Sequence, residues 1–293
     1  MNDHDAEAMT VARISPTLRQ RRLGMLLREL RSEDGRTSIE VARALGWSPS
    51  KVQRLEDAPR KPVVKEIIKL LDAYGVGDPK RGEILELVAQ ARQRGWWDTY
   101  RTSISRDYDM FIGLENEAKT LRTFEIVNIP GLLQTAGYAR ALMTARRPDM
   151  PAEEIEARVA VRTARQEHLL TGPDPVRLWA VLSEGALRRQ VGGAAVMRDQ
   201  LEHLLKVAEL PNVTIQVLDY AAGAAPAAGP FVVIDFARRT DLEVVYLETP
   251  GGAIWVEEKS ETDRYLLDFV RLVDTALTME RSLKLIGTLA GSL

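Results

Sequence analysis

A short polar segment, SPSKVQRLE at 48–56, carries side chains suited to reading nucleic acid. At 100° per residue, a helix over this segment turns Val52 and Leu55 inward and its polar residues outward. Arginine offers a fork that matches O6 and N7 of guanine, and glutamine offers an amide that matches adenine. The outward residues are Ser50, Lys51, Gln53 and Arg54. They predict a helix that lies in the major groove of DNA.

The elements around this helix determine how it is presented. Thr37 and Glu40 have the spacing of a capping box, so a helix of about eight residues begins there and ends at Gly46. Its inward residues are Val41, Ala42 and Leu45. Ser48 is placed to cap the following helix. Two short helices joined at LGWS predict a helix-turn-helix, with free N–H groups at both helix starts available to phosphates. The alternative is a plain helical bundle with a polar outer face.

Three further helices are predicted in the first 95 residues. Leu23, Leu26, Leu27 and Leu30 recur at helical spacing within 17–35, and Gly35 is placed to end that helix. A fourth helix has its inward face at Val64, Ile67, Ile68 and Leu71. The segment PKRGEILELVAQARQRG predicts a fifth.

Charge is distributed unevenly along the chain. Its net charge is −2, yet residues 13–65 hold thirteen Lys and Arg against six Asp and Glu. A basic block on a mildly acidic body is typical of a polyanion-binding module joined to a second domain. A solvated basic surface explains the same count equally well.

Residues 23–76 resemble the lambda-repressor-like, XRE-type helix-turn-helix family, through the run LLRELRSEDGRTSIEVARALGWSPSKVQRLEDAPRKP. The resemblance implies an all-α five-helix DNA-binding domain with Glu56 in a structural role. The sequence departs from the family pattern at Arg36, at the short Ser38 and at the DAP turn after Glu56. Together with the outward face, the resemblance predicts these DNA-binding residues: Thr37, Ser38, Ser48, Pro49, Ser50, Lys51, Gln53 and Arg54.

The later segments GWW, PGLLQTAGYARAL, RLWAVLSEGALRR and LPNVTIQVL carry a second resemblance. They are similar to the large C-terminal effector domain of actinomycete toxin–antitoxin-like XRE regulators, a domain of unknown function. Together the two resemblances cover about nine-tenths of the chain. They imply an antitoxin-like regulator with a small partner protein, often encoded by a neighbouring gene.

The pattern after residue 95 predicts an α+β effector domain. Helices are expected over 115–145, 152–170 and 194–210, and a helical stretch over 261–289. Strands are expected over 176–185 and in VTIQVLDY, FVVIDF, EVVYLET and AIWVEE. Helices followed by mostly sequential strands favour a small mixed or antiparallel sheet backed by helices. The predicted domains are a disordered acidic segment 1–16, a DNA-binding domain 17–95 and an effector/dimerisation domain 96–293.

Three arginines of the effector domain fall on one predicted helix face: Arg158, Arg162 and Arg165. They could bind an anion or an acidic partner. Because Glu153, Glu154 and Glu156 precede them, a solvated, self-paired face is the favoured interpretation. Tyr246, Glu248 and Trp255 on a predicted hairpin could line a pocket. Glu115 and Glu117 lie on different sides of a helix, which makes them poor partners in acid–base chemistry.

Two further features each allow two interpretations. The charge-free segment 220–230 is read as a flexible loop in preference to a lid over a ligand site. Trp96 and Trp97 could stack on a ligand, but at least one is expected to be a core anchor.

Several classes of site and location are not expected. Without cysteine, and with three scattered histidines, the chain predicts no disulfide, no metal site and no cofactor. Neither a GxSxG elbow nor a nucleotide-binding glycine loop in its proper context occurs, so no enzyme is predicted. The acidic N-terminus does not resemble a signal peptide, and no run is long enough to cross a membrane. A cytoplasmic location is expected.

The function expected from these patterns is that of a sequence-specific DNA-binding transcription regulator. It is expected to be a homodimer that reads the major groove of double-stranded DNA with helix 48–56. Its C-terminal domain is expected to dimerise and to sense a small-molecule effector or a small partner protein. The alternative is an antitoxin-like interaction protein whose main role is to bind that partner.

Overall fold

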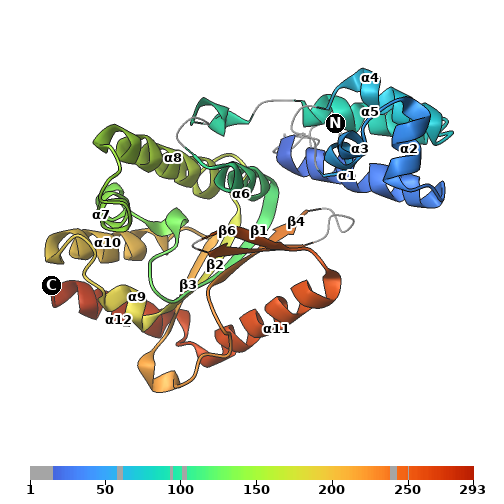
Figure 1. Cartoon of the computed structure of the whole chain (residues 1–293). Helices are drawn as coiled ribbons and strands as arrows, with labels where there is room; N and C mark the ends of the chain where they lie inside the picture. Colours follow the sequence, from blue (N-terminus) through green and yellow to red (C-terminus); the bar gives the residue numbers. More distant parts are fainter. Residues whose placement is uncertain (1–15, 58–61, 93–94, 101–103, 238–242, 250) are drawn as a thin grey trace, which may run out of the picture. The chain divides into compact units, whose positions relative to one another are not determined.

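The computed structural model describes residues 16–57, 62–92, 95–100, 104–237, 243–249 and 251–293 (Figure 1). Residue contacts divide the chain into two compact units, Arg13–Thr99 and Tyr100–Leu293. The predicted boundary at residue 95 lies just before this division. The predicted disordered segment 1–16 lies outside the described residues except for Pro16. No helix within the described ranges is long and apolar enough to cross a bilayer.

The first unit is helical. Its described elements are α1 (Pro16–Glu33), α2 (Ser38–Leu45), α3 (Pro49–Glu56), α4 (Val64–Ala73), α5 (Lys80–Ala91) and the 3-10 helix η1 (Trp96–Tyr100). Its core unites buried residues of the first five helices: Leu23, Leu27, Leu30, Val41, Ala42, Val52, Leu55, Ile67, Leu70, Leu71, Ile84, Leu87 and Val88. One predicted inward position was wrong: Val64 is 39% exposed, because it lies at the first residue of α4. Leu70 takes part in that buried face instead.

The predicted caps of the short helices are largely confirmed. Thr37 and Glu40 form both hydrogen bonds of the capping box at the start of α2. Gly46 ends α2 in the left-handed conformation, with φ 65°, which glycine adopts without a side-chain clash. Trp97 is 1% exposed and is therefore buried, as expected of a core residue. Ser48 lies at the N-cap position of α3, but its side chain makes no capping hydrogen bond.

The second unit combines helices with a six-stranded mixed sheet. Its strands are β1 (Ala118–Glu125), β2 (Arg177–Ser183), β3 (Val213–Leu218), β4 (Phe231–Phe236), β5 (Val244–Thr249) and β6 (Gly252–Val256). Its helices are α6 (Arg106–Glu117), η2 (Gly131–Leu133), α7 (Ala136–Arg146), α8 (Ala152–Leu170), α9 (Glu184–Arg188), α10 (Ala194–Val207), η3 (Tyr220–Ala222), α11 (Lys259–Thr275) and α12 (Met279–Gly291). The predicted α+β class is confirmed.

The strand order is β3-β2-β1-β4-β5-β6. β1 is central: it pairs parallel with β2 and antiparallel with β4. β3 pairs parallel with β2, whereas β5 and β6 continue antiparallel beyond β4. On the outer edge of β3, the Val217 N–H donates to Ser282 Oγ at 2.9 Å and the Leu277 N–H donates to the Val217 carbonyl at 2.9 Å. Ser282 of α12 and Leu277 just before this helix thus satisfy backbone groups that an open edge would expose.

The two faces of the sheet have different coverings. Phe124, Phe231 and Val245 belong to one core cluster with Phe269 and Leu272 of α11. Figure 1 shows α11 along one side of the sheet and α6 and α8 on the other. Since side chains alternate along a strand, the neighbours of these residues on β1, β4 and β5 point to the side of α6 and α8.

Two predicted helical segments were wrong in detail. The predicted helix 115–145 contains the end of α6, then β1, η2 and α7. The predicted stretch 261–289 is two helices, because Ala276 leaves helical geometry at ψ 159° and Thr278 caps α12 by accepting from the Arg281 N–H. The predicted helix 152–170 matches α8, and the other five strands lie where they were expected.

Candidate functional site

Helix α3 presents the outward face that its sequence predicts. Val52 and Leu55 are buried, while Gln53 and Arg54 are exposed. Ser48, Pro49 and Ser50 at the start of α3 are exposed as well. Among the described residues, the side chains of Gln53 and Arg54 have no hydrogen-bond or ion-pair partner. Both are therefore available for an external partner.

Ion pairs connect the C-terminal end of α3 to α1. Glu56 is 6% exposed and accepts hydrogen bonds from Arg31 Nε at 2.6 Å and Arg31 Nη2 at 2.8 Å. Arg28 adds an ion pair to Asp57 at 2.8 Å, directly after the helix. A bidentate arginine–carboxylate pair fixes direction as well as distance. This geometry agrees with the structural role that the resemblance implied for Glu56. It also fixes the orientation of α3 and so of the helix face that carries Arg54.

Other predicted contact residues already have partners within the protein. Lys51 Nζ lies 2.7 Å from Glu66 Oε1 and 4.3 Å from the centre of the Trp47 ring. The hydroxyls of Ser48 and Ser50 are 3.1 Å apart. For Lys51 to bind a phosphate, its ammonium group would have to exchange the Glu66 carboxylate for the phosphate.

The start of α2 also has an internal acid. The Glu40 carboxylate accepts hydrogen bonds from the Thr37 N–H and the Thr37 hydroxyl, both at 2.8 Å. These bonds, that from the N–H first, lower the pKa of Glu40 and keep the carboxylate charged. Ser38, the first residue of α2, is half-buried. A phosphate approaching this helix start would meet a negative charge, so α3 is the better placed of the two helices for DNA.

The structure explains why the sequence departs from the usual helix-turn-helix pattern at Arg36. Its guanidinium donates to the Asp34 carboxylate and to the Ala73 carbonyl at the end of α4. The same group lies 5.8 Å from the centre of the Tyr74 ring. Arg36 thus connects the start of α2 to α4 through polar contacts, in the place where the family usually has a leucine.

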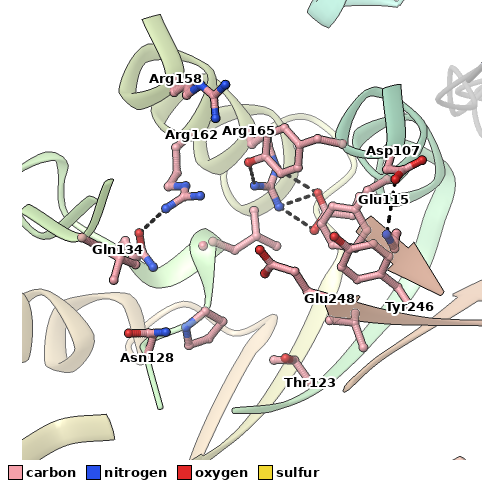
Figure 2. A pocket seen from close by; sticks show the side chains of 18 of the residues that line it. Asp107, Glu115, Thr123, Asn128, Gln134, Arg158, Arg162, Arg165, Tyr246 and Glu248 are labelled. Atoms are coloured by element: carbon pink, nitrogen blue, oxygen red, sulfur yellow. Dashed lines mark hydrogen bonds and ion pairs between the residues drawn. The ribbon is translucent and has the colours of Figure 1, made fainter. Parts of the chain in front are cut away.

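The second unit contains a cavity of about 330 Å³ on the sheet face opposite α11 (Figure 2). This volume falls at the lower end of the range for small-molecule sites. α6, β1, the loop 126–135, the end of α7, α8 and β5 all contribute to its walls. Tyr246 and Glu248 line the cavity as predicted, whereas Trp255 packs against Tyr246 with ring centres 4.9 Å apart and does not line it.

All three arginines of α8 line this cavity, so the expectation of a solvated face was wrong for part of the set. Arg165 is 3% exposed and forms a bidentate pair with Glu115 of α6, at 2.9 Å and 2.7 Å. It also donates to the Tyr108 hydroxyl. Burial by itself lowers the pKa of Arg165, but Glu115 and Tyr108 together raise it by more, and the guanidinium stays charged. Only Arg158 has the predicted partner, Glu154 at 2.7 Å.

The segment 220–230 lies away from this cavity. Its Ala227 is 9% exposed and belongs to the core cluster on the α11 face of the sheet. The lid that the sequence offered as an alternative therefore does not cover the cavity on the other face.

A half-buried acid of β1, Glu125, also lines the cavity. Its pKa is raised to about 8, mainly by burial and also by the Glu248 carboxylate, while Arg146 acts in the opposite direction. The folded protein therefore holds this proton up to about pH 8, while an unfolded chain releases it near the ordinary value of 4.5. Between these values the native state binds more protons, so its free energy of unfolding falls as pH rises.

We expect Glu125→Gln to flatten this dependence, because glutamine stays neutral at every pH. Urea unfolding at pH 5, 6.5 and 8.5 measures the effect. The parent should lose stability steadily across this series and Glu125→Gln should lose less. Glu202→Gln, at an exposed position on α10, serves as the control and should follow the parent. Equal slopes for the parent and Glu125→Gln would contradict the assignment.

Sequence reasoning missed several cavity residues: Tyr108, Glu125, Gln134 and Arg146. Once β1 is recognised as a strand, alternation places Leu121, Thr123 and Glu125 on one face, so a signal for Glu125 existed. Gln134 and Arg146 lie in a loop and at a helix end, where no periodic pattern marks them.

Family models match both units. The model described as a helix-turn-helix domain matches residues 22–84, which include α2 and α3 and indicate DNA binding. The model described as a domain of unknown function, DUF5753, matches residues 108–288, from α6 into α12. No curated protein and no solved structure matches the chain.

Proposed function

Because the chain belongs to the DUF5753 family and carries a helix-turn-helix domain ahead of that match, we propose that it is a sequence-specific transcription regulator. The observation that supports this most is the outer face of α3. Gln53 and Arg54 are exposed and have no partner among the described residues, and the Arg31–Glu56 pair anchors the helix that carries them. α3 enters the major groove, where Arg54 reads guanine and Gln53 reads adenine.

The regulator acts as a homodimer in this proposal. One helix-turn-helix covers too few base pairs to select a site within a genome. Two copies related by a two-fold axis read half-sites about 10 base pairs apart, or a multiple of that spacing. The second unit is the larger of the two and supplies the pairing surface.

The second unit also senses a signal in this proposal. Its cavity supports a small-molecule effector. A regulator of this type has no catalytic role, and it works in the cytoplasm where it meets DNA.

A second candidate function is that of an antitoxin-like protein whose main role is to bind a small partner protein. It is supported by two apolar side chains one turn apart on α11: Leu267 is 50% exposed and Val270 is 54% exposed. Exposed apolar neighbours of this kind occur at protein-binding surfaces, although two residues make only a small patch. The two functions are compatible within one chain.

Footprinting of genomic DNA with the purified full-length protein tests the proposal. We expect protection of one pseudo-palindromic sequence, and sedimentation at micromolar concentration should give a dimer. Protection without sequence preference would contradict specific recognition, and a monomer that protects a single half-site would contradict the dimer. Adding the product of a neighbouring gene tests the second candidate, because a partner that binds changes the sedimentation of the complex.

A further inference from the structure

Arg162 has an unusual place in the wall of the cavity. Its guanidinium donates to the side-chain oxygen of Gln134, which is neutral, and no carboxylate of the described residues pairs with it. Gln134 is 4% exposed, and its amide nitrogen donates to the Ile129 carbonyl at 2.6 Å, so its oxygen has to face the arginine. The protein thus holds one arginine in place without neutralising its charge (Figure 2).

Each of the other arginines that line the cavity has a carboxylate partner. Arg146 lies 3.5 Å from Glu248, Arg158 lies 2.7 Å from Glu154, and Arg147 lies 3.3 Å from Asp149. Arg165 is neutralised by Glu115. Among the described arginines of the lining, Arg162 is therefore the one without an ion pair.

Two N–H groups on this wall have no acceptor. The Nε atoms of Arg158 and Arg162 are buried and lack a hydrogen-bond partner among the described residues. The two residues are one turn apart on α8, so their side chains lie on the same face of the helix. Most buried donors in proteins are satisfied, and a pair that is not points to a bound group.

Part of the remaining wall is apolar. Leu142 and Met143 of α7, together with Met150, line one part of the cavity, and Phe111 and Tyr246 line another. The last two rings lie with their centres 4.3 Å apart. Aromatic and methionine side chains provide an adaptable surface for the hydrocarbon part of a ligand.

We propose that the cavity binds a small organic anion, whose carboxylate or phosphate is held by Arg162 and Arg158 and whose apolar body packs against Phe111, Tyr246 and the α7 side chains. The guanidinium groups of these two residues donate to the anionic group. Guanidinium groups suit this task because their planar fork matches both carboxylate and phosphate oxygens. Gln134 is a positioning residue, since it acts on the ligand through Arg162.

The role of this anion as the effector of the regulator rests on the proposed function. Its binding to the cavity does not depend on that function. If the anion shifts DNA affinity, linkage requires that DNA shift the affinity for the anion by the same factor.

Calorimetry on the full-length protein without DNA tests the binding. The probes are 3-phenylpropionate, phenyl phosphate, inorganic phosphate and the neutral 3-phenylpropionamide. We expect at least one of the two aromatic anions to bind with a Kd below about 1 mM, and the neutral amide and inorganic phosphate to bind at least tenfold more weakly. A preference between the two aromatic anions identifies the anionic group.

Variants locate the binding. Arg162→Gln should lower the affinity for the anion by about tenfold to a hundredfold, which is the usual effect of losing a charge-assisted hydrogen bond. Arg198→Gln, at an exposed position on α10 outside the cavity lining, removes the same charge and should bind like the parent. Because Arg162 is half-buried, melting of each variant is measured first, and Arg162→Lys supplies a folded variant that retains the charge without the fork.

Three outcomes would overturn the inference: no binding of either aromatic anion at 5 mM, equal affinity for the neutral amide, or equal weakening by Arg162→Gln and Arg198→Gln. The proposed function fails separately. Anion binding with no footprint on DNA would support the assignment of the cavity and contradict the proposed transcription regulator. A clear footprint without anion binding would support the regulator and contradict the assignment of the cavity.

Discussion

Replacing Arg165 with methionine should lower the free energy of unfolding of the second unit by about 3–5 kcal/mol. The change leaves the Glu115 carboxylate in a site where it is 2% exposed, without the two hydrogen bonds that now compensate its burial. A buried charge without a partner is far costlier than the pair. Native-state hydrogen exchange at the amides of β1 and β2 measures the loss for this unit alone.

Two further variants separate the charge from the packing. Arg165→Met combined with Glu115→Leu should recover most of the lost stability, because both charges leave together. Arg158→Met removes a partly exposed i,i+4 pair with Glu154 and should change stability by no more than about 1 kcal/mol. A loss below about 1 kcal/mol for Arg165→Met would show that the Arg165–Glu115 pair is solvated.

Arg54→Ala should weaken binding to the specific DNA site by about 1–3 kcal/mol per half-site and relax the preference at one base position. Arg54 is exposed and has no hydrogen-bond or ion-pair partner among the described residues, so its removal disturbs no such contact there. The free energy of unfolding of the Arg54→Ala variant should therefore equal that of the parent. Fluorescence anisotropy on the footprinted sequence and on single-base variants measures both effects, at one salt concentration throughout.

The control for Arg54→Ala is Arg264→Ala, an exposed arginine of α11 whose removal changes the net charge equally. Gln53→Ala should relax a different base position from Arg54→Ala. If Arg54→Ala binds every sequence as the parent does, α3 is not the reading helix. If it weakens all sequences alike, Arg54 contacts phosphate.

The fold of the first unit could be predicted closely from its sequence, because local signals determine it. The capping box of Thr37 and Glu40, the left-handed Gly46 and the leucine spacing of α1 each act within one or two turns of helix. The ion pair between Lys51 and Glu66 could not be foreseen, since it depends on how α4 packs beside α3.

The central strand of the second unit was missed for a physical reason. In AKTLRTFE, Ala118, Leu121 and Phe124 recur every third residue, a spacing that imitates a helical face. They are all buried because β1 has a strand on each side and side chains cover both faces of the sheet. Strands buried on both faces lose the simple alternation that sequence reasoning relies on.

Prediction from the sequence was limited in a similar way for single residues of the cavity. Arg158, Arg162 and Arg165 share one helix and one spacing, and the acids before them gave all three the same predicted partners. Their surroundings differ, because Glu115 comes from α6, Gln134 comes from the loop before α7 and only Glu154 lies on α8 itself. Partners fifty residues away in sequence can be identified only once the tertiary fold is known.

The central place of β1 also affects how the chain is made. Roughly a hundred residues separate the end of β1 from the start of β4, its antiparallel neighbour. At about 5–20 residues per second, a ribosome takes roughly 5–20 s to synthesise them. During that interval β2 and β3 emerge, but the other edge of β1 presents unpaired N–H and C=O groups. The nascent second unit therefore exposes a site for chaperones, or for aggregation, for several seconds after the helix-turn-helix has been synthesised.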